Sequence, residues 1–446
     1  TYYWRVDEIN AAPDYTIFKG PIWSFTVEPY SYPLAVAAAT ASSSQPNMGP
    51  ENTINGSGLD ANDQHNTNLT SMWMTPGGKP AWIQYEFDKV YKLDEMWVWN
   101  SNQAIESFLG FGAKTVVIEY SIDGETWTAL EGVPEFAKAT GMPTYTANTV
   151  VDFNGVLAKF VKLTIEANWG GLAQTGLSEV RFFYVPLHAF NPQPVVGATG
   201  VSVEARLDWR PGREAVSHRV FLGTDSSAVA AGTAASETLG GHGYAPAGLL
   251  LDTRYYWRVD EIGDPGTYAG DVWDFTTEAY AVVDDFEGYT DDVEAETTIW
   301  HAWIDGVTDG ASGSQVGYTE SPFAERTVVH AGSQAMPLFY NNTSFAFSEA
   351  KRTFDSPQDW TAHGVGKLTI YFAGAEGNAG QLYARINNAK IAYAGDPADL
   401  AKTDWHAWDI DLSAAGNVGS VRTLTIGVEG SGATGTLYID DIRLSP

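Results

Sequence analysis

The stretch Tyr2-Tyr-Trp-Arg-Val-Asp-Glu-Ile-Asn10 recurs almost unchanged as Tyr255-Tyr-Trp-Arg-Val-Asp-Glu-Ile-Gly263. A second match follows each copy, over 20–30 in the first and 270–280 in the second, and both contain Trp-x-Phe-Thr. A self-match of this quality identifies a repeated module. Because large apolar side chains stand at alternate positions, we predict a pair of β-strands in each copy.

The composition predicts an all-β protein of several domains. A chain of 446 residues is too long for one core and suits three or four domains. Its aromatic content is 13%, beside 45 Gly and 21 Pro, which is typical of short strands separated by turns. No window shows a sustained helical period of apolar residues.

The chain is strongly acidic, with 55 Asp and Glu against 25 Lys and Arg and a formal charge of −30. This balance argues against nucleic acid and anionic membranes as partners, since both require a basic surface. It is compatible with bound calcium, with neutral polysaccharides, or with a solvated, salt-tolerant surface that has no specific partner. No apolar run approaches the roughly 20 residues of a membrane span, so we expect no membrane insertion.

The repeated module resembles the fibronectin type III domain. The stretch Leu249-Leu-Leu-Asp-Thr-Arg-Tyr255 is similar to the leucine–threonine–tyrosine corner of that family. The resemblance implies a complete fibronectin III-like spacer over 187–280. Residues 1–30 would then be the C-terminal strands of a truncated fibronectin III-like module, or strands that pair with another chain.

Residues 31–186 contain a series of strand-like motifs in a characteristic order. Among them are Ala81-Trp-Ile-Gln-Tyr-Glu-Phe87, Met96-Trp-Val-Trp-Asn100, and Val116-Val-Ile-Glu-Tyr-Ser-Ile-Asp-Gly124 with its hairpin-turn signal. The series resembles the discoidin (coagulation-factor C-type) domain, a jelly roll shared with many carbohydrate-binding modules. The resemblance implies a jelly roll that binds polysaccharide or a cell-surface glycan.

Residues 281–446 open with Val283-Asp-Asp-Phe-Glu-Gly288 and close with Leu437-Tyr-Ile-Asp-Asp-Ile-Arg-Leu444. These two ends resemble those of another β-jelly-roll carbohydrate-binding module. We therefore predict tandem β-sandwiches, with two jelly rolls alternating with fibronectin III-like modules. The layout is similar to large secreted proteins of planctomycete-type bacteria, which implies an extracellular or cell-surface location.

Two groups of oxygen donors are candidate sites for structural calcium, which prefers carboxylate and carbonyl oxygens. The loop 55–66 is rich in Gly, Asn and Asp, and the discoidin resemblance adds a glutamate near the last strand. In the C-terminal segment the resemblance brings carboxylates of the two terminal strands together. The alternatives are a polar loop with Asx-turns and solvated carboxylates at strand ends. The candidate ligands are Asn55, Asp60, Asp63 and Glu179 in the first site, and Asp285, Glu287, Asp440 and Asp441 in the second.

Sugar binding requires exposed aromatic faces, because pyranose rings stack on them, and planar polar groups nearby. In the discoidin-like segment the candidates are Asn102, Glu106, Phe108 and Trp169. In the last segment they are Trp300, Trp303 and Tyr340; we expect one of Trp300 and Trp303 to be exposed, because both cannot face the same way on a regular strand. The family pocket often includes an arginine, whereas residues 31–186 contain only Arg181.

No nucleophile elbow, His-Glu-x-x-His motif or phosphate-binding glycine loop occurs in the sequence. With 55 acidic residues, the sequence does not exclude a pair of carboxylates placed for glycoside hydrolysis. We predict a non-enzymatic extracellular segment that binds glycan and is stabilised by calcium. The alternative is a structural subunit of a surface fibre or adhesin that self-associates by strand addition through residues 1–30.

Overall fold

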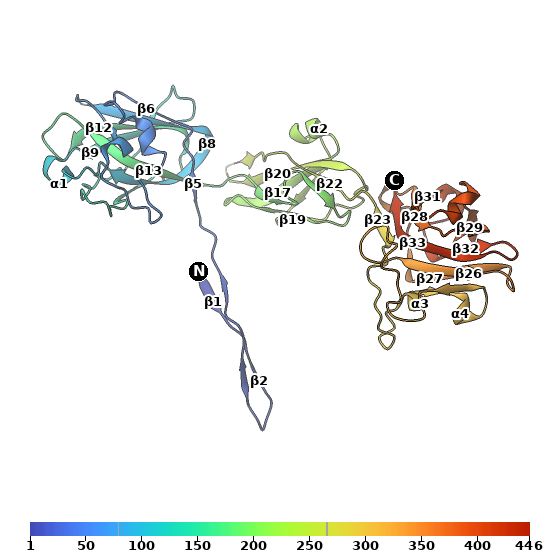
Figure 1. Cartoon of the computed structure of the whole chain (residues 1–446). Coiled ribbons are helices and arrows are strands. Elements are labelled where there is room, and N and C mark those ends of the chain that lie inside the picture. Colours follow the sequence, from blue (N-terminus) through green and yellow to red (C-terminus); the bar gives the residue numbers. More distant parts are fainter. Residues whose placement is uncertain (79, 265) are drawn as a thin grey trace. The chain divides into compact units, whose positions relative to one another are not determined.

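The computed structural model describes residues 1–78, 80–264 and 266–446, and it confirms the all-β prediction (Figure 1). The chain divides into two compact units, one of residues 1–190, 211–216 and 261–268 and the other of residues 191–210, 217–260 and 269–446. In the described part of the chain, no helix has the length and apolarity to span a bilayer.

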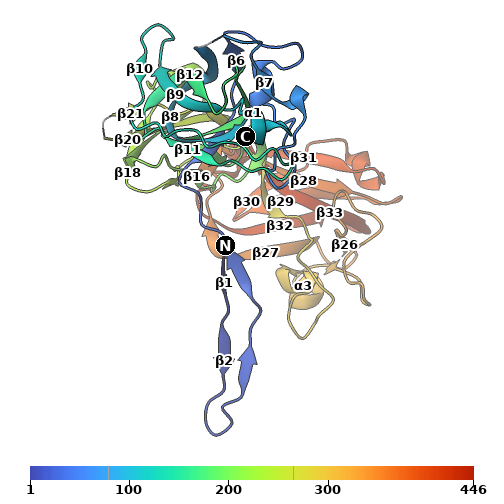
Figure 2. The same ribbon diagram turned by 90° about the vertical axis from the view of Figure 1, so that its left-hand side faces the viewer.

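Residues 1–25 form a two-stranded antiparallel ribbon (Figure 2). Its strands are β1 (Tyr2–Trp4), β2 (Asp7–Ile9), β3 (Ile17–Lys19) and β4 (Trp23–Phe25), with β1 paired to β4 and β2 paired to β3. All of these strand residues are exposed, including the aromatic ones. The ribbon therefore presents apolar side chains to solvent on both faces.

Residues 32–185 form one nine-stranded antiparallel sheet that folds over on itself. The long strand β8 belongs to both layers: its first part pairs with β12 and β6, and its second part pairs with β13 and β11. The strands are β5 (Tyr32–Leu34), β6 (Ala38–Ala41), β7 (Trp73–Met74), β8 (Ala81–Asn100), β9 (Ala113–Ser121), β10 (Thr128–Ala129), β11 (Thr149–Asp152), β12 (Leu157–Asn168) and β13 (Gly176–Val185); the helices are η1 (Pro50–Thr53), η2 (Leu69–Ser71) and α1 (Glu106–Leu109).

The core of this sandwich follows from the alternation along β8. Ile83, Tyr85 and Phe87 point inward from the first part of the strand, and Met96 and Val98 point inward from the second. These side chains belong to one buried cluster with alternate residues of β9, β12 and β13. The period-two pattern that predicted the strands thus also decides which face is buried.

Residues 190–277 form two further sheets. One has the order β14-β16-β19, and the other has the order β15-β22-β20-β17-β18 with β21 beside β20. The elements are β14 (Phe190–Gln193), β15 (Ala198–Val201), β16 (Leu207–Arg210), β17 (Ala215–Gly223), α2 (Ser226–Ala230), β18 (Ser236–Leu239), β19 (Gly243–Tyr244), β20 (Arg254–Gly263), β21 (Thr267–Tyr268) and β22 (Trp273–Thr277). Trp209 of one sheet meets Trp257 of the other, with ring centroids 6.3 Å apart. Leu250 N donates to the Tyr255 hydroxyl at 2.9 Å, which is the contact expected of a tyrosine corner.

The two copies of the repeat have the same strand register but opposite burial. Tyr2 pairs with Phe25 and Trp4 with Trp23, just as Tyr255 pairs with Phe275 and Trp257 with Trp273. The tryptophan rings lie 4.6 Å apart in the first copy and 4.8 Å apart in the second. The four aromatic side chains are 41–59% exposed in the first copy and at most 8% exposed in the second.

Residues 281–446 form a sandwich of two sheets, ordered β25-β26-β33-β28-β31, with β23 beside β33, and β24-β27-β32-β29-β30. The strands are β23 (Ala281–Asp284), β24 (Trp303–Ile304), β25 (Ser314–Val316), β26 (Met336–Asn341), β27 (Phe347–Gln358), β28 (Lys367–Ala373), β29 (Gln381–Ile386), β30 (Ala389–Ala392), β31 (His406–Asp411), β32 (Val421–Glu429) and β33 (Thr434–Ser445). The helices are α3 (Ile299–Ala302), α4 (Gly306–Asp309), η3 (Ala362–Gly364), η4 (Pro397–Ala401) and η5 (Leu412–Ala415). One buried apolar cluster joins the two sheets.

Candidate functional site

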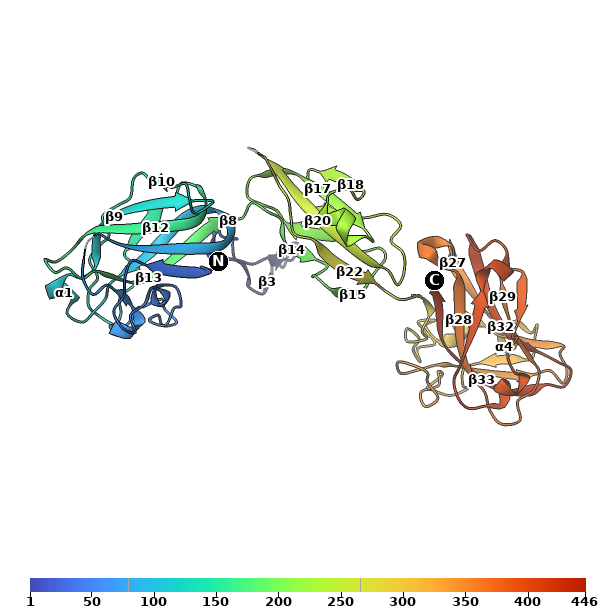
Figure 3. The same cartoon turned by 90° about the horizontal axis from the view of Figure 1, so that it is seen from above.

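Three loops meet at one end of the 32–185 sandwich. β9 begins at Ala113 opposite Asn168, the last residue of β12, so the loop before β9 and the loop after β12 leave the sheet together (Figure 3). A third loop joins them, because Lys138 Nζ donates to the Ser107 carbonyl at 3.0 Å. We call residues 102–112, 137–142 and 169–175 the apical loops.

Asn102 holds the apical loops together from within. Its side chain is fully buried, and three carbonyl oxygens, those of His65, Asn66 and Met142, lie 2.8–3.1 Å from its Nδ2. Its Oδ1 accepts from Gly141 N at 2.9 Å. A buried amide that satisfies several backbone groups rigidifies the loops around it, because breaking it leaves those groups unpaired. These contacts give Asn102 a role in positioning the loops, whereas the sequence predicted that it contacts a ligand.

Glu106 is buried in the same way. Its carboxylate accepts from Phe111 N at 3.1 Å and from Gly112 N at 2.8 Å, which fixes the turn between α1 and β9. Burial raises the pKa of Glu106 to about 7, against the lowering effect of these two N–H groups. Glu106 was also predicted to contact a ligand, and its burial contradicts that prediction.

The loop after β12 packs tightly on the loop before β9. A Cβ atom on Gly170 would lie 1.7 Å from the Leu109 carbonyl oxygen, so only glycine fits here. Trp169 Nε1 donates to the Phe136 carbonyl at 2.8 Å, and Lys114 Nζ lies 4.8 Å from the centre of its ring. The indole is thereby held in one orientation while 36% of its surface stays exposed.

Phe108 and Trp169 are the two predicted ligand contacts that the structure leaves accessible on the apical loops. Phe108 is 87% exposed on α1. Four further exposed apolar side chains that were not predicted from the sequence share these loops: Ile105, Leu109, Met142 and Leu172. Loop residues carry no periodic pattern, so no sequence signal separated these four from other surface residues. We call the six side chains together the apical surface.

Arg181 has its partners outside the apical surface. Its guanidinium makes a bidentate ion pair with the Asp63 carboxylate, with Nη2–Oδ1 and Nη1–Oδ2 distances of 2.7 and 3.0 Å. The guanidinium also lies over the Trp99 ring. Asp63 was predicted as a calcium ligand, but this pair already neutralises its carboxylate, and Arg181 holds the pKa of Asp63 below its usual value. The predicted role of Asp63 therefore does not fit the structure.

The other candidate ligands near the loop 55–66 differ in their partners. Asn55 Oδ1 accepts from Ser57 N, and Asp60 Oδ1 accepts from Asn62 N and Gln64 N, which are Asx-turn contacts. Glu179 is buried. Within the described residues, its carboxylate accepts a hydrogen bond from Gly56 N, which lies at a long 3.3 Å from each of the two oxygens. Burial raises the pKa of Glu179 to about 7. A buried carboxylate with so little compensation is chemically suited to a nearby cation.

The carboxylates of the C-terminal segment mostly have protein partners. Glu287 accepts from Ser333 N and Gln334 N, while Asp440 accepts from His330 N at 2.8 Å and Ala331 N at 3.2 Å. Asp441 contacts His330 Nδ1 and Arg443. Asp285 is exposed, and its carboxylate accepts from the backbone of Glu287.

No cluster of three or more His, Cys, Asp or Glu side chains suited to a metal is found among residues 1–78, 80–264 and 266–446. The predicted grouping of Asp285, Glu287, Asp440 and Asp441 into one site is therefore not seen.

The three aromatic residues predicted to contact a sugar in the last segment, Trp300, Trp303 and Tyr340, are all at least half-buried. Trp300 lies on the short helix α3 rather than on a strand, half-buried against Phe323. Trp303 is fully buried and donates from Nε1 to Asp284, which also pairs with Arg352. Tyr340 is buried, and its hydroxyl donates to the Ala379 carbonyl at 3.0 Å. Trp303 and Tyr340 are thus core residues, and their rings are not available for stacking on a sugar.

The match to a protein-family model falls on the sandwich that carries the apical surface. Residues 38–178 match the F5/8 type C domain family. This confirms the predicted discoidin resemblance for that part of the chain. No curated protein matches the chain.

Several solved structures are similar to about a third of this chain. The family 32 carbohydrate-binding module of AlyQ, in complex with 4,5-unsaturated mannuronic acid, is 19% identical over 34% of this chain and 98% of its own, with a TM-score of 0.25. The family 32 module of Clostridium perfringens NanJ, in complex with galactose, is 16% identical over 33% of this chain and 92% of its own, with a TM-score of 0.24. The family 89 glycoside hydrolase from Clostridium perfringens is 15% identical over 33% of this chain and 14% of its own, with a TM-score of 0.23.

Proposed function

We propose that the discoidin-like segment is a non-catalytic module that binds polysaccharide or a cell-surface glycan through its apical surface. The observation that carries the proposal is the exposure of Phe108 and Trp169 on loops that buried polar side chains hold in place. Aromatic faces stack on the C–H faces of pyranose rings, and rigid loops reduce the entropy lost on binding. The family match over residues 38–178 supports the same role. An extracellular location is part of the proposal, since glycans of this kind lie outside the cell.

Structural calcium near the loop 55–66 belongs to the same proposal. The ion would be held by Glu179 and by backbone carbonyl groups of the loop 55–66, which Glu179 contacts at Gly56. Asp60 lies in the same loop. The ion would add to the positive charge of Arg181, which already acts on the buried Glu179 carboxylate. Thermal melting with calcium and after chelation tests this, and calcium should raise the melting temperature of the parent more than that of Glu179→Gln. No stabilisation of the parent would exclude calcium, and equal stabilisation of both would exclude Glu179 as a ligand.

Replacing Phe108 by alanine tests the binding surface. Phe108→Ala should weaken retention on a polysaccharide panel about tenfold or more, because the most exposed ring of the apical surface is lost. The matched control is Ile122→Ala, since Ile122 is exposed just beyond the opposite end of β9. Retention that is absent for every polymer, or unchanged by Phe108→Ala, would contradict the proposal.

A second candidate function, assembly between chains, is favoured by the ribbon of residues 1–25. Its aromatic pairs match those that the second copy buries against Trp209 and its neighbours. A sheet like β14-β16-β19 would cover the aromatic pairs of the ribbon, and in this second candidate function another chain contributes that sheet. Strand addition of this kind uses the unpaired edges and the apolar face together.

Deletion of residues 1–30 tests this assembly. The full chain should show a molar mass that rises with concentration in light scattering, and the shortened chain should stay monomeric. A milder variant, Trp4→Ser with Trp23→Ser, keeps the backbone of the ribbon and should give the same result. A full chain that is monomeric at every concentration would exclude self-association.

A further inference from the structure

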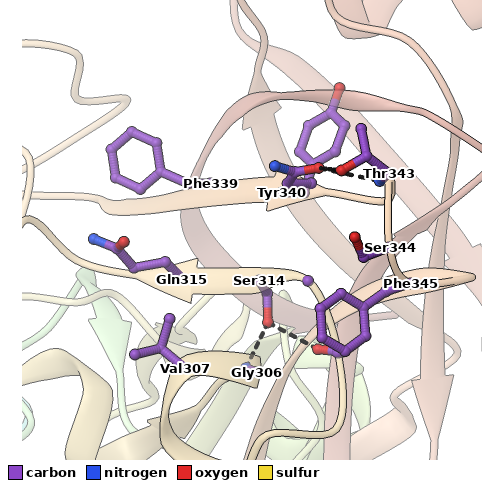
Figure 4. A pocket seen from close by; sticks show the side chains of 12 residues that line it. Gly306, Val307, Ser314, Gln315, Phe339, Tyr340, Thr343, Ser344 and Phe345 are labelled. Atoms are coloured by element: carbon purple, nitrogen blue, oxygen red, sulfur yellow. Dashed lines mark hydrogen bonds between the residues drawn. The ribbon is translucent and has the colours of Figure 1, made fainter.

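The C-terminal segment contains a pocket of 390 Å³ between α4, β25 and β26 (Figure 4). This volume lies within the usual range of small-molecule sites, about 300–1,000 Å³. The pocket lies on the outer side of the sheet edge, where β25 is the last strand beside β26. Twelve residues line it: Gly306, Val307, Ser312, Gly313, Ser314, Gln315, Phe339, Tyr340, Asn341, Thr343, Ser344 and Phe345. Tyr340 contributes its backbone, because its ring is buried in the core.

The floor of the pocket is built before any ligand binds. Ser314 Oγ accepts from Gly306 N at 2.8 Å and donates to the Glu349 carbonyl at 2.6 Å, which ties α4 to the sheet. A Cβ on Gly313 would lie 2.0 Å from the Asn341 carbonyl oxygen. The backbones therefore approach closely only because this position is glycine.

The walls combine aromatic and amide side chains. Phe345 is 42% exposed, Phe339 is half-buried, and Figure 4 shows their rings on opposite sides of the pocket. Gln315 and Asn341 supply side-chain amides, and Asn341 Oδ1 accepts from Thr343 N and Oγ1 at 3.1 and 2.7 Å. Aromatic faces with a few fixed planar polar groups are the combination that recognises a sugar ring.

The pocket is also uncharged, which limits the class of ligand. None of its twelve lining residues is Asp, Glu, Lys, Arg or His, although Asp, Glu, Lys and Arg make up 18% of the chain. A carboxylate or sulfate that entered would lose hydration without gaining a cation, and the net charge of −30 would repel it. We propose that this pocket binds an uncharged sugar unit of a neutral polysaccharide.

This second site is independent of the apical surface, and the experiment separates the two. The full chain carrying Phe108→Ala is titrated calorimetrically with neutral oligosaccharides of xylose, glucose, mannose and galactose, and with oligogalacturonate as the acidic probe. At least one neutral probe should bind, and oligogalacturonate should not. Phe345→Ala and Gln315→Glu should each weaken that binding about tenfold or more, the first by removing a ring and the second by adding a charge.

The control is Val293→Ala, an exposed apolar residue in a different loop of the same segment, which should leave the affinity unchanged. Circular dichroism confirms that each variant is folded, as expected for substitutions at partly exposed positions. The proposal is overturned if no neutral probe binds, if both pocket variants bind as well as their parent, or if oligogalacturonate binds and Phe345→Ala weakens it.

Discussion

In the monomeric chain, Trp257→Ala should lower the free energy of unfolding by about 3–5 kcal/mol, whereas Trp4→Ala should change it by less than about 0.5 kcal/mol. The two tryptophans stand in the same sequence, Tyr-Tyr-Trp-Arg-Val-Asp-Glu-Ile, and in the same strand register. Trp257 is fully buried against Trp209 and Trp273, and its removal leaves a cavity; Trp4 is exposed and leaves none. Comparing these two variants separates the effect of packing on stability from the effect of the local sequence, which is the same in both copies.

Amide hydrogen exchange of β20 measures the first effect within a chain of several modules, since the slowest amides report unfolding of their own module. The same measurement on β1 gives the baseline for an unsupported ribbon. If Trp4→Ala costs as much as Trp257→Ala, the ribbon has a partner surface in solution. If neither costs more than about 1 kcal/mol, the packing described for the second copy is wrong.

Asn102→Ala should destabilise the apical loops by about 3 kcal/mol or more and abolish glycan retention. The substitution leaves the carbonyls of His65, Asn66 and Met142 and the N–H of Gly141 without their buried partner, at about 1–3 kcal/mol for each group that water does not reach. The loops that carry Phe108 would then lose their fixed arrangement.

Asn62→Ala provides the matched control, because Asn62 is an exposed asparagine in the loop 55–66 and should have little effect on either readout. Hydrogen exchange of residues 102–112 and 137–142 reports the loops, and affinity electrophoresis reports binding. If Asn102→Ala abolishes retention while the exchange of these loops is unchanged, Asn102 contacts the glycan directly, and the positioning role assigned to it fails.

The sequence predicted the strands well because alternation is a local property. Ile83, Tyr85 and Phe87 occupy alternate positions and are all buried, as the period-two pattern requires. The repeat also predicted a pair of strands in each copy, and Tyr2 and Tyr255 have equivalent partners in those pairs. It could not reveal burial, because burial depends on a second sheet that lies far away in the sequence.

The candidate site was predicted less completely. Phe108 and Trp169 were placed on the correct loops, but Asn102, Glu106, Trp303 and Tyr340 proved to be buried. A polar or aromatic residue in a loop has the same sequence signature whether it faces solvent or holds the loop from within. Likewise, nothing in the sequence of the loop 55–66 indicated that Arg181, more than a hundred residues away, forms an ion pair with Asp63.

The central claim is that the apical surface of the discoidin-like segment binds glycan. The most direct measurement is amide hydrogen exchange of the full chain with and without the polysaccharide that retains it best. The account predicts slower exchange in residues 104–111 and 169–173, little change elsewhere in residues 31–186, and loss of this protection in Phe108→Ala. Protection confined to other parts of the segment, with the apical loops unchanged, would contradict it.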